Sequence, residues 1–577
     1  MSSTDTPVSD EFRGRRLRLG LLVDGLTQPA WVVEALRQIL AEDYADIVCV
    51  VINGAEAPAG PPPSRSPSAR AARLWGNRKA VPFALYKRFD NWRYPPSRDP
   101  EAGTDVAALI PQTAATLTVV PRMTKFCDYF PDDAVAWVQS QSVDVFLRLG
   151  FRILKGPILS SSRFGVWSFH HGDNTINRGG PAGFWELFTA APTSGAVLQR
   201  LSEELDAGHV MARSFSSTNP HSFRRNRANF YWQAGQLLPA NLRQLYEQGP
   251  ASLQLLTGSS SQWEAYSQPL FVAPKPLEVA SLFLRLAGRL IGRKLLLLVK
   301  QKQWFIAYRY IKNMPDASDV PDGAPYRFKE LMPPRDRIWA DPFPVAHDGR
   351  RYLFFEEFLN SEKHAHISVL EFDAQGNPGP MRVVLERPYH LSYPNVFRWN
   401  DTWYMVPETY SQRRVELYRS DDFPFSWTFE KALLEDIDAV DSTLAEIDGT
   451  WWLMLATLMR GTEEASALHL FHADSPLGPW TPHRRNPVKV DVRSARPAGK
   501  LFRQNGRLYR PAQDGSPTYG TAMVINEILE ITPTTFREVE VARIDPVWRP
   551  GLTGTHTINA AGGLTVIDAR QWRSRWR

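Results

Sequence analysis

Short apolar runs and amphipathic stretches alternate over the first part of the chain. Residues 18–24 (RLGLLVD) and 45–53 (ADIVCVVIN) have the apolar, β-branched character of buried strands. Between them, residues 30–41 carry apolar side chains at helical spacing, and a later helix at 132–140 precedes a strand at 146–149. Strand, helix and strand in this order predict the opening of a parallel α/β sheet.

The pattern changes to a repeat beyond about residue 303. Its unit is a short strand, a hairpin turn and an aromatic strand, and copies begin near residues 340, 393, 441, 496 and, more weakly, 555. Successive copies start about 50 to 60 residues apart, a spacing that fits one four-stranded blade each. Five copies predict a five-bladed β-propeller, and the segment near residue 305 (QWFIAYRY) could pair with the last copy to close the ring.

Two helical segments separate these halves, at 224–247 and 277–299. The second is apolar and also basic, through Arg285, Arg289, Arg293 and Lys294. A basic amphipathic helix can lie on an anionic membrane surface. The other interpretation is a helix packed between two domains, with its Arg side chains reaching water.

Composition limits the classes of protein. At 577 residues the chain is too long for one hydrophobic core, and 43% apolar residues suffice for packed domains. The net charge of +6 suits a mildly basic soluble protein or one with an anionic substrate, and it does not favour a nucleic-acid binder. Cys49 and Cys127 indicate reduced thiols, and no signal peptide or apolar membrane-spanning run is evident, so a cytoplasmic location is expected.

Residues 146–206 carry the most specific chemistry. FLRLGFRIL is followed by GVWSFHH, which ends one strand with His170 and His171, and then by ELDAGHV, which contains Asp206. A His and an Asp at two strand-edge turns of one α/β sheet can converge on the crevice where such sheets bind ligands. An isolated His is more often a satisfied core residue, and a metal site at HHGD lacks an evident third ligand.

This order and spacing resemble the formyltransferases that use 10-formyltetrahydrofolate. The resemblance covers roughly residues 15–215, and it implies that His170 and Asp206 are catalytic. Ser168 occupies the position of the family's catalytic asparagine. The backbone of Arg152, Ile153 and Leu154 matches the family segment that contacts the pterin. The resemblance therefore implies 10-formyltetrahydrofolate as co-substrate and an amine as acceptor.

The repeat region resembles the family 43 glycoside hydrolases and, more closely, the N-terminal domain of plant glucosamine inositolphosphorylceramide transferases. The residues that match inner-strand positions are Asp341, Glu408, Asp441, Arg496 and Asp514. By this resemblance Asp341 matches the hydrolase base, Asp441 the aspartate that tunes the acid, and Glu408 the acid. Paired carboxylates serve glycosidic-bond chemistry. The same residues could also bind sugar without cutting it or serve only the fold.

Together these features predict a multidomain α/β plus all-β protein. The expected parts are a flexible tail (1–14), a Rossmann-like formyltransferase domain (15–215), a helical linker (216–300) and a five-bladed β-propeller (301–577). The leading hypothesis is a formyltransferase that acts on an amino sugar held by the propeller. The alternatives are a glycosidase or glycosyl-transferring propeller enzyme with a degenerate formyltransferase scaffold, and a non-catalytic carbohydrate-binding module.

Overall fold

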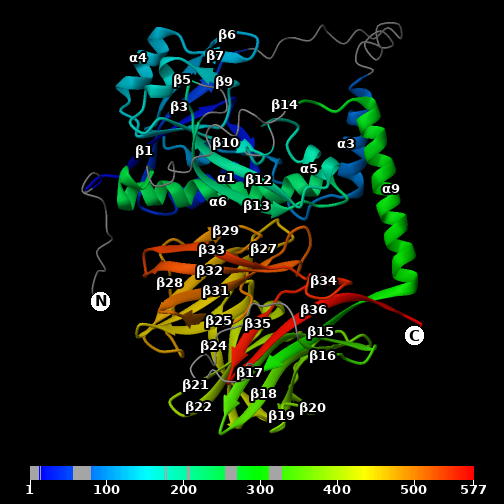
Figure 1. Cartoon of the computed structure of the whole chain (residues 1–577). Coiled ribbons are helices and arrows are strands. Elements are labelled where there is room, and N and C mark those ends of the chain that lie inside the picture. Colours follow the sequence, from blue (N-terminus) through cyan, green and yellow to red (C-terminus); the bar gives the residue numbers. More distant parts are fainter. Residues whose placement is uncertain are drawn as a thin grey trace. The chain divides into compact units, whose positions relative to one another are not determined.

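The computed structural model describes residues 12, 14–55, 79–174, 176, 178–203, 208–253, 270–310 and 328–576 (Figure 1). The chain divides into unit 1, residues 1–287 with 460–462, and unit 2, residues 288–459 with 463–577. The described part is mainly β, with several sheets and few helices.

A seven-stranded sheet forms the centre of unit 1, in the order β13-β12-β10-β8-β1-β3-β5. Five strands from β10 to β5 are parallel, and β12 and β13 continue the sheet in antiparallel fashion. The strands are β1 (Leu17–Val23), β3 (Ala45–Asn53), β5 (Ala115–Val119), β8 (Val145–Arg148), β10 (Val166–His171), β12 (Thr193–Arg200) and β13 (His209–Ser217). The strands and the helix predicted near the start of the chain are confirmed here.

Helices cover both faces of this sheet. α1 (Ala30–Leu40) and α6 (Phe223–Gln248) pack on one face, and α4 (Asp132–Ser140) packs on the other (Figure 1). Side chains alternate between the faces of a strand, so Leu19 and Leu21 of β1 point to the first core and Leu22 points to the second. This alternation makes every residue of β1 except Arg18 buried.

Smaller elements complete unit 1. They are β2 (Thr27–Pro29) with β4 (Gly103–Asp105), β6 (Arg122–Met123) with β7 (Cys127–Tyr129) and β9 (Ile153–Lys155), β11 (Arg178–Gly179) with β14 (Leu270–Phe271), and the 3-10 turns Ala107–Leu109 and Pro157–Ser160. A third apolar cluster joins α3 (Val81–Arg93), α5 (Phe184–Thr189) and the first half of α9 (Pro276–Val299). Within the described residues, no helix combines the length and the apolar character needed to cross a membrane.

The carboxyl ends of β1 and β8 are held together at Gly150. The backbone N–H groups of Leu149 and Gly150 both donate to the carbonyl of Leu22, at 2.8 Å each. A Cβ atom on residue 150 would lie 2.2 Å from the backbone nitrogen of Asp24, so only glycine fits this approach. The loop after β8 therefore lies against the end of β1.

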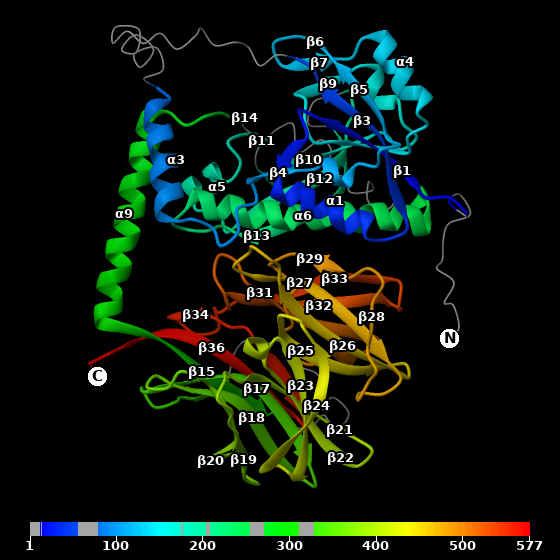
Figure 2. The same ribbon diagram turned by 180° about the vertical axis from the view of Figure 1, so that it is seen from behind.

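Unit 2 consists of five antiparallel sheets (Figure 2). Four are successive along the chain: β17 (Arg337–His347) to β20 (Pro378–Leu385), β21 (Ser392–Trp399) to β24 (Ser426–Glu435), β25 (Ala439–Ile447) to β29 (Lys489–Val490), and β30 (Phe502–Gln504) to β33 (Phe536–Ile544). The remaining strands of these four sheets are β18 (Arg350–Leu359), β19 (His366–Phe372), β22 (Thr402–Glu408), β23 (Arg414–Asp422), β26 (Thr450–Leu458), β27 (Ala465–Ala473), β28 (Thr481–Pro482), β31 (Arg507–Asp514) and β32 (Ala522–Ile531).

The fifth sheet joins strands from opposite ends of unit 2. β15 (Lys300–Tyr310) pairs along its whole length with β36 (Leu564–Ser574), and β16 (Lys329–Leu331), β34 (Leu552–Gly554) and β35 (Ile558–Ala561) complete it. This is the pairing expected of the segment near residue 305. Because the two strands lie more than 250 residues apart, only the tertiary structure brings them together.

A buried ion pair fastens the fourth sheet. Arg510 on β31 donates from Nε and Nη2 to the two carboxylate oxygens of Glu538 on β33, at 2.8 and 2.6 Å, and from Nη2 to the carbonyl of Ser494. Lys489 adds a contact of 2.7 Å to the same carboxylate. Burial disfavours the ionised carboxyl, but these cations outweigh it and hold the pKa of Glu538 below its usual value.

Replacing Glu538 by Gln should lower the free energy of unfolding by about 3 kcal/mol, because the buried Arg510 guanidinium loses its countercharge. Urea denaturation followed by circular dichroism measures this. Glu540→Gln, on an exposed position of the same strand, is the matched control and should change stability by less than about 0.5 kcal/mol. Equal effects of the two substitutions would contradict a special role for the pair.

Candidate functional site

Three first strands of the sheets in unit 2 share a strained bulge. The antiparallel register slips between Ala340 and Phe343 in β17, and at the corresponding points of β21 and β25. At each slip one non-glycine residue has a positive φ: 49° at Asp341, 46° at Tyr393 and 52° at Asp441. Bulges re-aim side chains, and positive φ at such residues stores strain that often marks a functional site.

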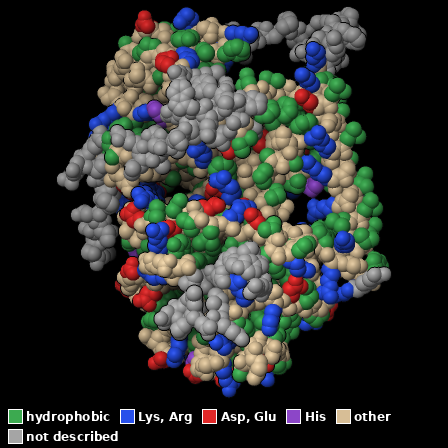
Figure 3. All heavy atoms as spheres, viewed as in Figure 1, with side chains coloured by type: hydrophobic (Ala, Val, Ile, Leu, Met, Phe, Trp, Pro, Cys, Tyr) green, Lys and Arg blue, Asp and Glu red, His purple; other side chains and the backbone are tan. Residues whose placement is uncertain are grey.

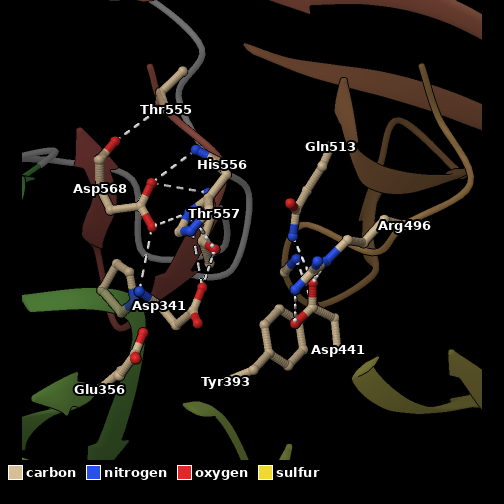
Figure 4. A network of polar contacts seen from close by, with 12 residues as sticks. Asp341, Glu356, Tyr393, Asp441, Arg496, Gln513, Thr555, His556, Thr557 and Asp568 are labelled. Atoms are coloured by element: carbon tan, nitrogen blue, oxygen red, sulfur yellow. Dashed lines mark hydrogen bonds and ion pairs between the residues drawn. The ribbon is translucent and has the colours of Figure 1, made fainter. Parts of the chain in front are cut away.

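The Asp341 side chain lies in a network built from the fifth sheet (Figure 4). The Thr557 hydroxyl donates to Asp341 Oδ1 at 2.6 Å, and the backbone N–H of Asp341 donates to Asp568 Oδ2 at 3.2 Å. The backbone N–H groups of His556 and Thr557 donate to Asp568 Oδ1 at 2.8 and 3.0 Å. The His556 ring also pairs with the Asp568 carboxylate, and its Nδ1 lies 3.8 Å from Asp341 Oδ1.

Burial sets the protonation of this network. It raises the pKa of Asp341 to about 7; His556 opposes the shift, and the nearby Asp441 and Glu356 carboxylates add to it. Burial lowers the pKa of His556, but the Asp568 and Asp341 carboxylates outweigh it and raise the pKa above its usual value. Asp341 is therefore a carboxyl that gains or loses a proton near neutral pH.

A second network surrounds Asp441 (Figure 4). Arg496 donates from Nε to Asp441 Oδ2 at 2.5 Å and from Nη2 to Oδ1 at 3.3 Å, and Gln513 Nε2 donates to Oδ2 at 2.5 Å. The backbone N–H of Asp441 donates to Glu408 Oε2 at 3.2 Å, and Arg496 Nη2 lies 3.6 Å from that oxygen. The structure thus brings three predicted residues, Glu408, Asp441 and Arg496, into direct contact.

Glu408 is the second carboxyl whose charge is disfavoured. Burial raises its pKa well above the usual value, the Asp441 carboxylate adds to the shift, and Arg496 opposes it. Burial disfavours the charged guanidinium of Arg496, but Asp441 outweighs it and holds the pKa high. The site therefore combines a carboxyl whose protonated form is favoured (Glu408), one that titrates near neutrality (Asp341) and one paired with a cation (Asp441).

This combination is suited to general acid–base chemistry. Carboxyls whose environments push their pKa values apart can divide the roles of acid and base between them. The ligand atoms of Asp341, His556 and Asp568 also lie within 4.8 Å of one another, so these three residues could hold a metal ion. Oxygen-rich sets of this kind suit hard cations such as Ca²⁺.

Several members of the site were not predicted from sequence. They are Tyr393, Gln513, His556, Thr557 and Asp568. One signal was present: three of the repeat copies carry a residue followed by Pro near their start, as Asp341-Pro342, Tyr393-Pro394 and Arg496-Pro497. No such signal marks His556 or Asp568, whose repeat is the most divergent.

Asp514, the fifth predicted residue of unit 2, is engaged elsewhere. Its carboxylate accepts from Ser516 and from Arg543 Nη1, the latter at 2.7 Å. Unit 2 also has a cavity of about 470 Å³. Its lining includes Pro344, Phe397, Trp403, Lys500 and Asn559. None of the five predicted residues of unit 2 lines this cavity.

In unit 1, the predicted residues that the structure describes have separate surroundings. The Ser168 hydroxyl accepts from Arg148 Nη1 at 2.9 Å, and the Arg152 side chain pairs with the buried Asp128. His170 lies on β10 opposite Val197. Asp206 lies outside the described residues.

The segment expected to contact a pterin uses its backbone groups internally. The carbonyls of Phe151 and Arg152 accept from Arg148 at 3.1 and 2.9 Å, and the N–H of Arg152 donates to Asp128 at 2.9 Å. Ile153 and Leu154 lie in β9, where Leu154 pairs with Asp128 of β7. Within the predicted segment, the carbonyl and the N–H of Arg152 are thus both engaged by other protein groups.

The raised pKa of Asp341 predicts a pH-dependent stability. Protonated Asp341 is favoured in the folded state, so its contribution is fully present below about pH 4 and is lost as pH rises through about 7. Asp341→Asn, which can still accept from Thr557, should reduce the decline in Tm between about pH 5 and pH 8 by several degrees. Differential scanning calorimetry measures this, with Asp348→Asn, 84% exposed, as the control. An unchanged decline in Asp341→Asn would show that Asp341 titrates normally.

Comparison with known proteins finds a family match in unit 2. Residues 332–546 match the family described as "Glucosamine inositolphosphorylceramide transferase 1, N-terminal". Glucosamine inositolphosphorylceramide transferase 1 of Oryza sativa subsp. japonica is 38% identical over 206 residues, which is 35% of this chain and 28% of the relative. The chain thus spans little more than a quarter of that relative.

Two solved structures show more distant likeness. The family 117 glycoside hydrolase Zg3597 of Zobellia galactanivorans is 13% identical, with 47% of this chain and 90% of that chain covered and a TM-score of 0.31. Glycinamide ribonucleotide transformylase 1 of Symbiobacterium toebii is 12% identical, with coverage of 41% and 90% and a TM-score of 0.26. TM-scores this low do not establish a common fold.

These comparisons correct the predicted enzyme class. The matching family and the curated relatives are named for glucosamine inositolphosphorylceramide transfer and not for formyl transfer, so the prediction of a formyltransferase is wrong. The geometry gives a physical reason, because Arg148 already engages the Ser168 hydroxyl that was expected at the reacting centre. What the comparisons support is a likeness of residues 332–546 to the N-terminal family of glucosamine inositolphosphorylceramide transferases.

Proposed function

We propose that unit 2 is a five-bladed β-propeller that binds the sugar part of a glycolipid or glycan and makes or breaks a glycosidic bond. The observation that carries this proposal is a group of three carboxyls, with Asp341 and Asp441 at strained bulges and Glu408 at the end of β22. Asp341 and Glu408 have raised pKa values, and Asp441 is paired with Arg496. The family match over residues 332–546 supports a carbohydrate transferase.

The three carboxyls have different roles in this proposal. Glu408, which keeps its proton, donates it to the oxygen of the leaving group. Asp341 in its ionised form accepts a proton from the incoming hydroxyl of water or of an acceptor sugar. Asp441 contacts Glu408 through its backbone and pairs with Arg496, so it positions the acid and raises its pKa.

The substrate class follows from the relatives. Their name specifies a glucosamine donor group and an inositolphosphorylceramide acceptor, and we infer a related phosphoinositol-containing lipid or its glycosylated form for this chain. Unit 1 is inferred to be a Rossmann-like α/β domain, since five of its seven central strands are parallel with helices on both faces.

A lipid-linked substrate agrees with the surface of α9. Its first half packs against α3 and α5, but its second half exposes apolar residues, with Ile291 and Leu295 at 59% and Leu298 at 65%. Arg293 and Lys294 are exposed on the same half. Hydrophobic and basic side chains lie along the edge of Figure 3 where Figure 1 places α9. We infer that this half of α9 lies on an anionic membrane surface, with its apolar residues among the acyl chains.

Substitution of the acid and the base should abolish turnover. With inositolphosphorylceramide and a nucleotide-activated glucosamine or N-acetylglucosamine as substrates, Glu408→Gln and Asp341→Asn should each reduce product, detected by mass spectrometry, by about 100-fold or more. A second assay measures hydrolysis of the glycosylated lipid. Asp348→Asn, exposed in the hairpin between β17 and β18, should retain full activity. Wild-type protein that forms no product in either assay, or variants that keep its rate, would refute the proposed chemistry.

The membrane contact is tested separately by vesicle flotation. The double substitution Leu295→Asn and Leu298→Asn should weaken binding to vesicles containing phosphatidylserine about tenfold, because less apolar area is buried in the interface. The matched control is Val539→Asn with Val541→Asn, two exposed apolar residues of β33. Failure of the wild-type chain to float, or equal losses in both double variants, would favour a helix that packs against protein.

A further inference from the structure

A cavity of about 300 Å³ opens in unit 1 at the carboxyl ends of β1, β8 and β10. Ligands of open α/β sheets bind at this edge, because the connections leave the strand ends there to form a crevice. Five of the residues that line the cavity carry aromatic rings: Trp31, Phe151, Phe169, His171 and Tyr231. The proposed chemistry of unit 2 uses none of these residues.

Arg148, at the end of β8, brings a positive charge into this cavity. Its guanidinium makes three hydrogen bonds, all to uncharged acceptors: Nε to the Arg152 carbonyl at 2.9 Å, Nη1 to the Ser168 hydroxyl at 2.9 Å, and Nη2 to the Phe151 carbonyl at 3.1 Å. A guanidinium has five N–H donors, so two remain. Within the part of the chain that the structure describes, Arg148 forms no ion pair.

The Arg148 guanidinium forms no ion pair with the described residues, and this is unfavourable in a largely buried position unless a ligand supplies a countercharge. Burial lowers the pKa of Arg148, and the carboxylates of Asp24 and Asp128 act on it only at longer range. Of the two acidic residues that line the cavity, Asp24 accepts from the N–H of Phe151 and from Asn53. The other, Glu101, is paired with Arg224 and Arg227. Asp24 forms no hydrogen bond or ion pair with Arg148 and raises its pKa only from a distance, and Glu101 is already paired, so neither carboxylate contacts the guanidinium directly.

The aromatic walls are ordered by contacts among themselves. The Trp31 ring meets the edge of Phe169 at a centroid distance of 4.9 Å and stacks on Tyr231 at 5.7 Å. Burial lowers the pKa of His171 to about 3, so its ring is neutral at pH 7. Its Nε2 is buried and has no hydrogen-bond partner among the described residues, which leaves one more polar atom for a ligand.

We propose that this cavity binds a small molecule with one anionic group and a flat ring. The anion, a carboxylate or a phosphate, receives the two remaining N–H donors of Arg148 in a charge-assisted bidentate contact. The ring packs against Trp31 and Phe169, and His171 Nε2 forms a hydrogen bond with a polar group of the ring. A ligand of this kind supplies the countercharge that the described residues do not provide.

Calorimetric titration of the full chain tests the proposal with four probes of similar size: benzoate, phenyl phosphate, neutral benzamide and cationic benzylamine. At least one anion should bind at least tenfold more tightly than benzamide, and benzylamine should not bind. The better of the two anions identifies the source as a carboxylate or a phosphate monoester. Arg148→Met should remove the preference for the anion, whereas Arg122→Met, on an exposed residue of β6 away from the cavity, should keep it.

Arg148→Lys covers the case in which Arg148→Met does not fold, judged by circular dichroism. Lys keeps the positive charge but cannot donate two parallel hydrogen bonds as the guanidinium does. The anion should therefore bind more weakly than to the wild type and still better than benzamide. The proposal is overturned if neither anion binds the wild-type chain, if benzamide binds as tightly as both anions, or if Arg122→Met loses as much affinity as the Arg148 variants.

Discussion

The burial of carboxyl groups at backbone bulges is the constraint on which unit 2 depends. Asp341 and Asp441 are held in the left-handed region of φ, where a branched or bulky side chain is strained, and both side chains are removed from water. A buried carboxylate must be protonated, paired or hydrogen-bonded. The surrounding residues meet that requirement in different ways, and this difference separates the chemistry of the two carboxyls.

Asp441 is compensated by a cation. Arg496 reaches it from the segment before β30 and Gln513 reaches it from β31, so its charge is balanced and its geometry is fixed. Asp341 instead accepts from the Thr557 hydroxyl and lies 3.8 Å from His556, which is already paired with Asp568. His556 offsets the effect of burial on Asp341 only in part, and the pKa of Asp341 is therefore near 7. At that value a small change in its surroundings alters its charge. Such a group is suited to transfer a proton during a reaction at neutral pH.

In unit 1 the charged group is a cation: the Arg148 guanidinium, which forms no ion pair with the described residues. Arg148 donates to the Ser168 hydroxyl, which the formyltransferase resemblance assigned to catalysis, and to the Arg152 carbonyl, which lies in the segment that it assigned to the pterin. Arg148, at the end of β8, therefore brings a positive charge to this sheet edge that the resemblance did not predict. The sequence FLRLG contains this Arg, but a single Arg in an apolar run does not show where its side chain goes.

Local pattern was sufficient to predict the early strands and helices, since apolar spacing in residues 18–53 reflects the two cores on either side of the sheet. The repeat spacing likewise predicted sheets beginning at β17, β21 and β25, and it pointed to Asp341, Glu408, Asp441 and Arg496. The sequence by itself thus determined the types of element, their order and several charged residues at their ends. Only the tertiary structure decided the partners: Thr557, His556 and Asp568 reach Asp341 from more than 200 residues away, and Arg148 donates to the Ser168 hydroxyl. The physical reason is that pKa values and hydrogen bonds depend on which groups are buried together, and neighbours distant in the chain leave no periodic signal in the sequence.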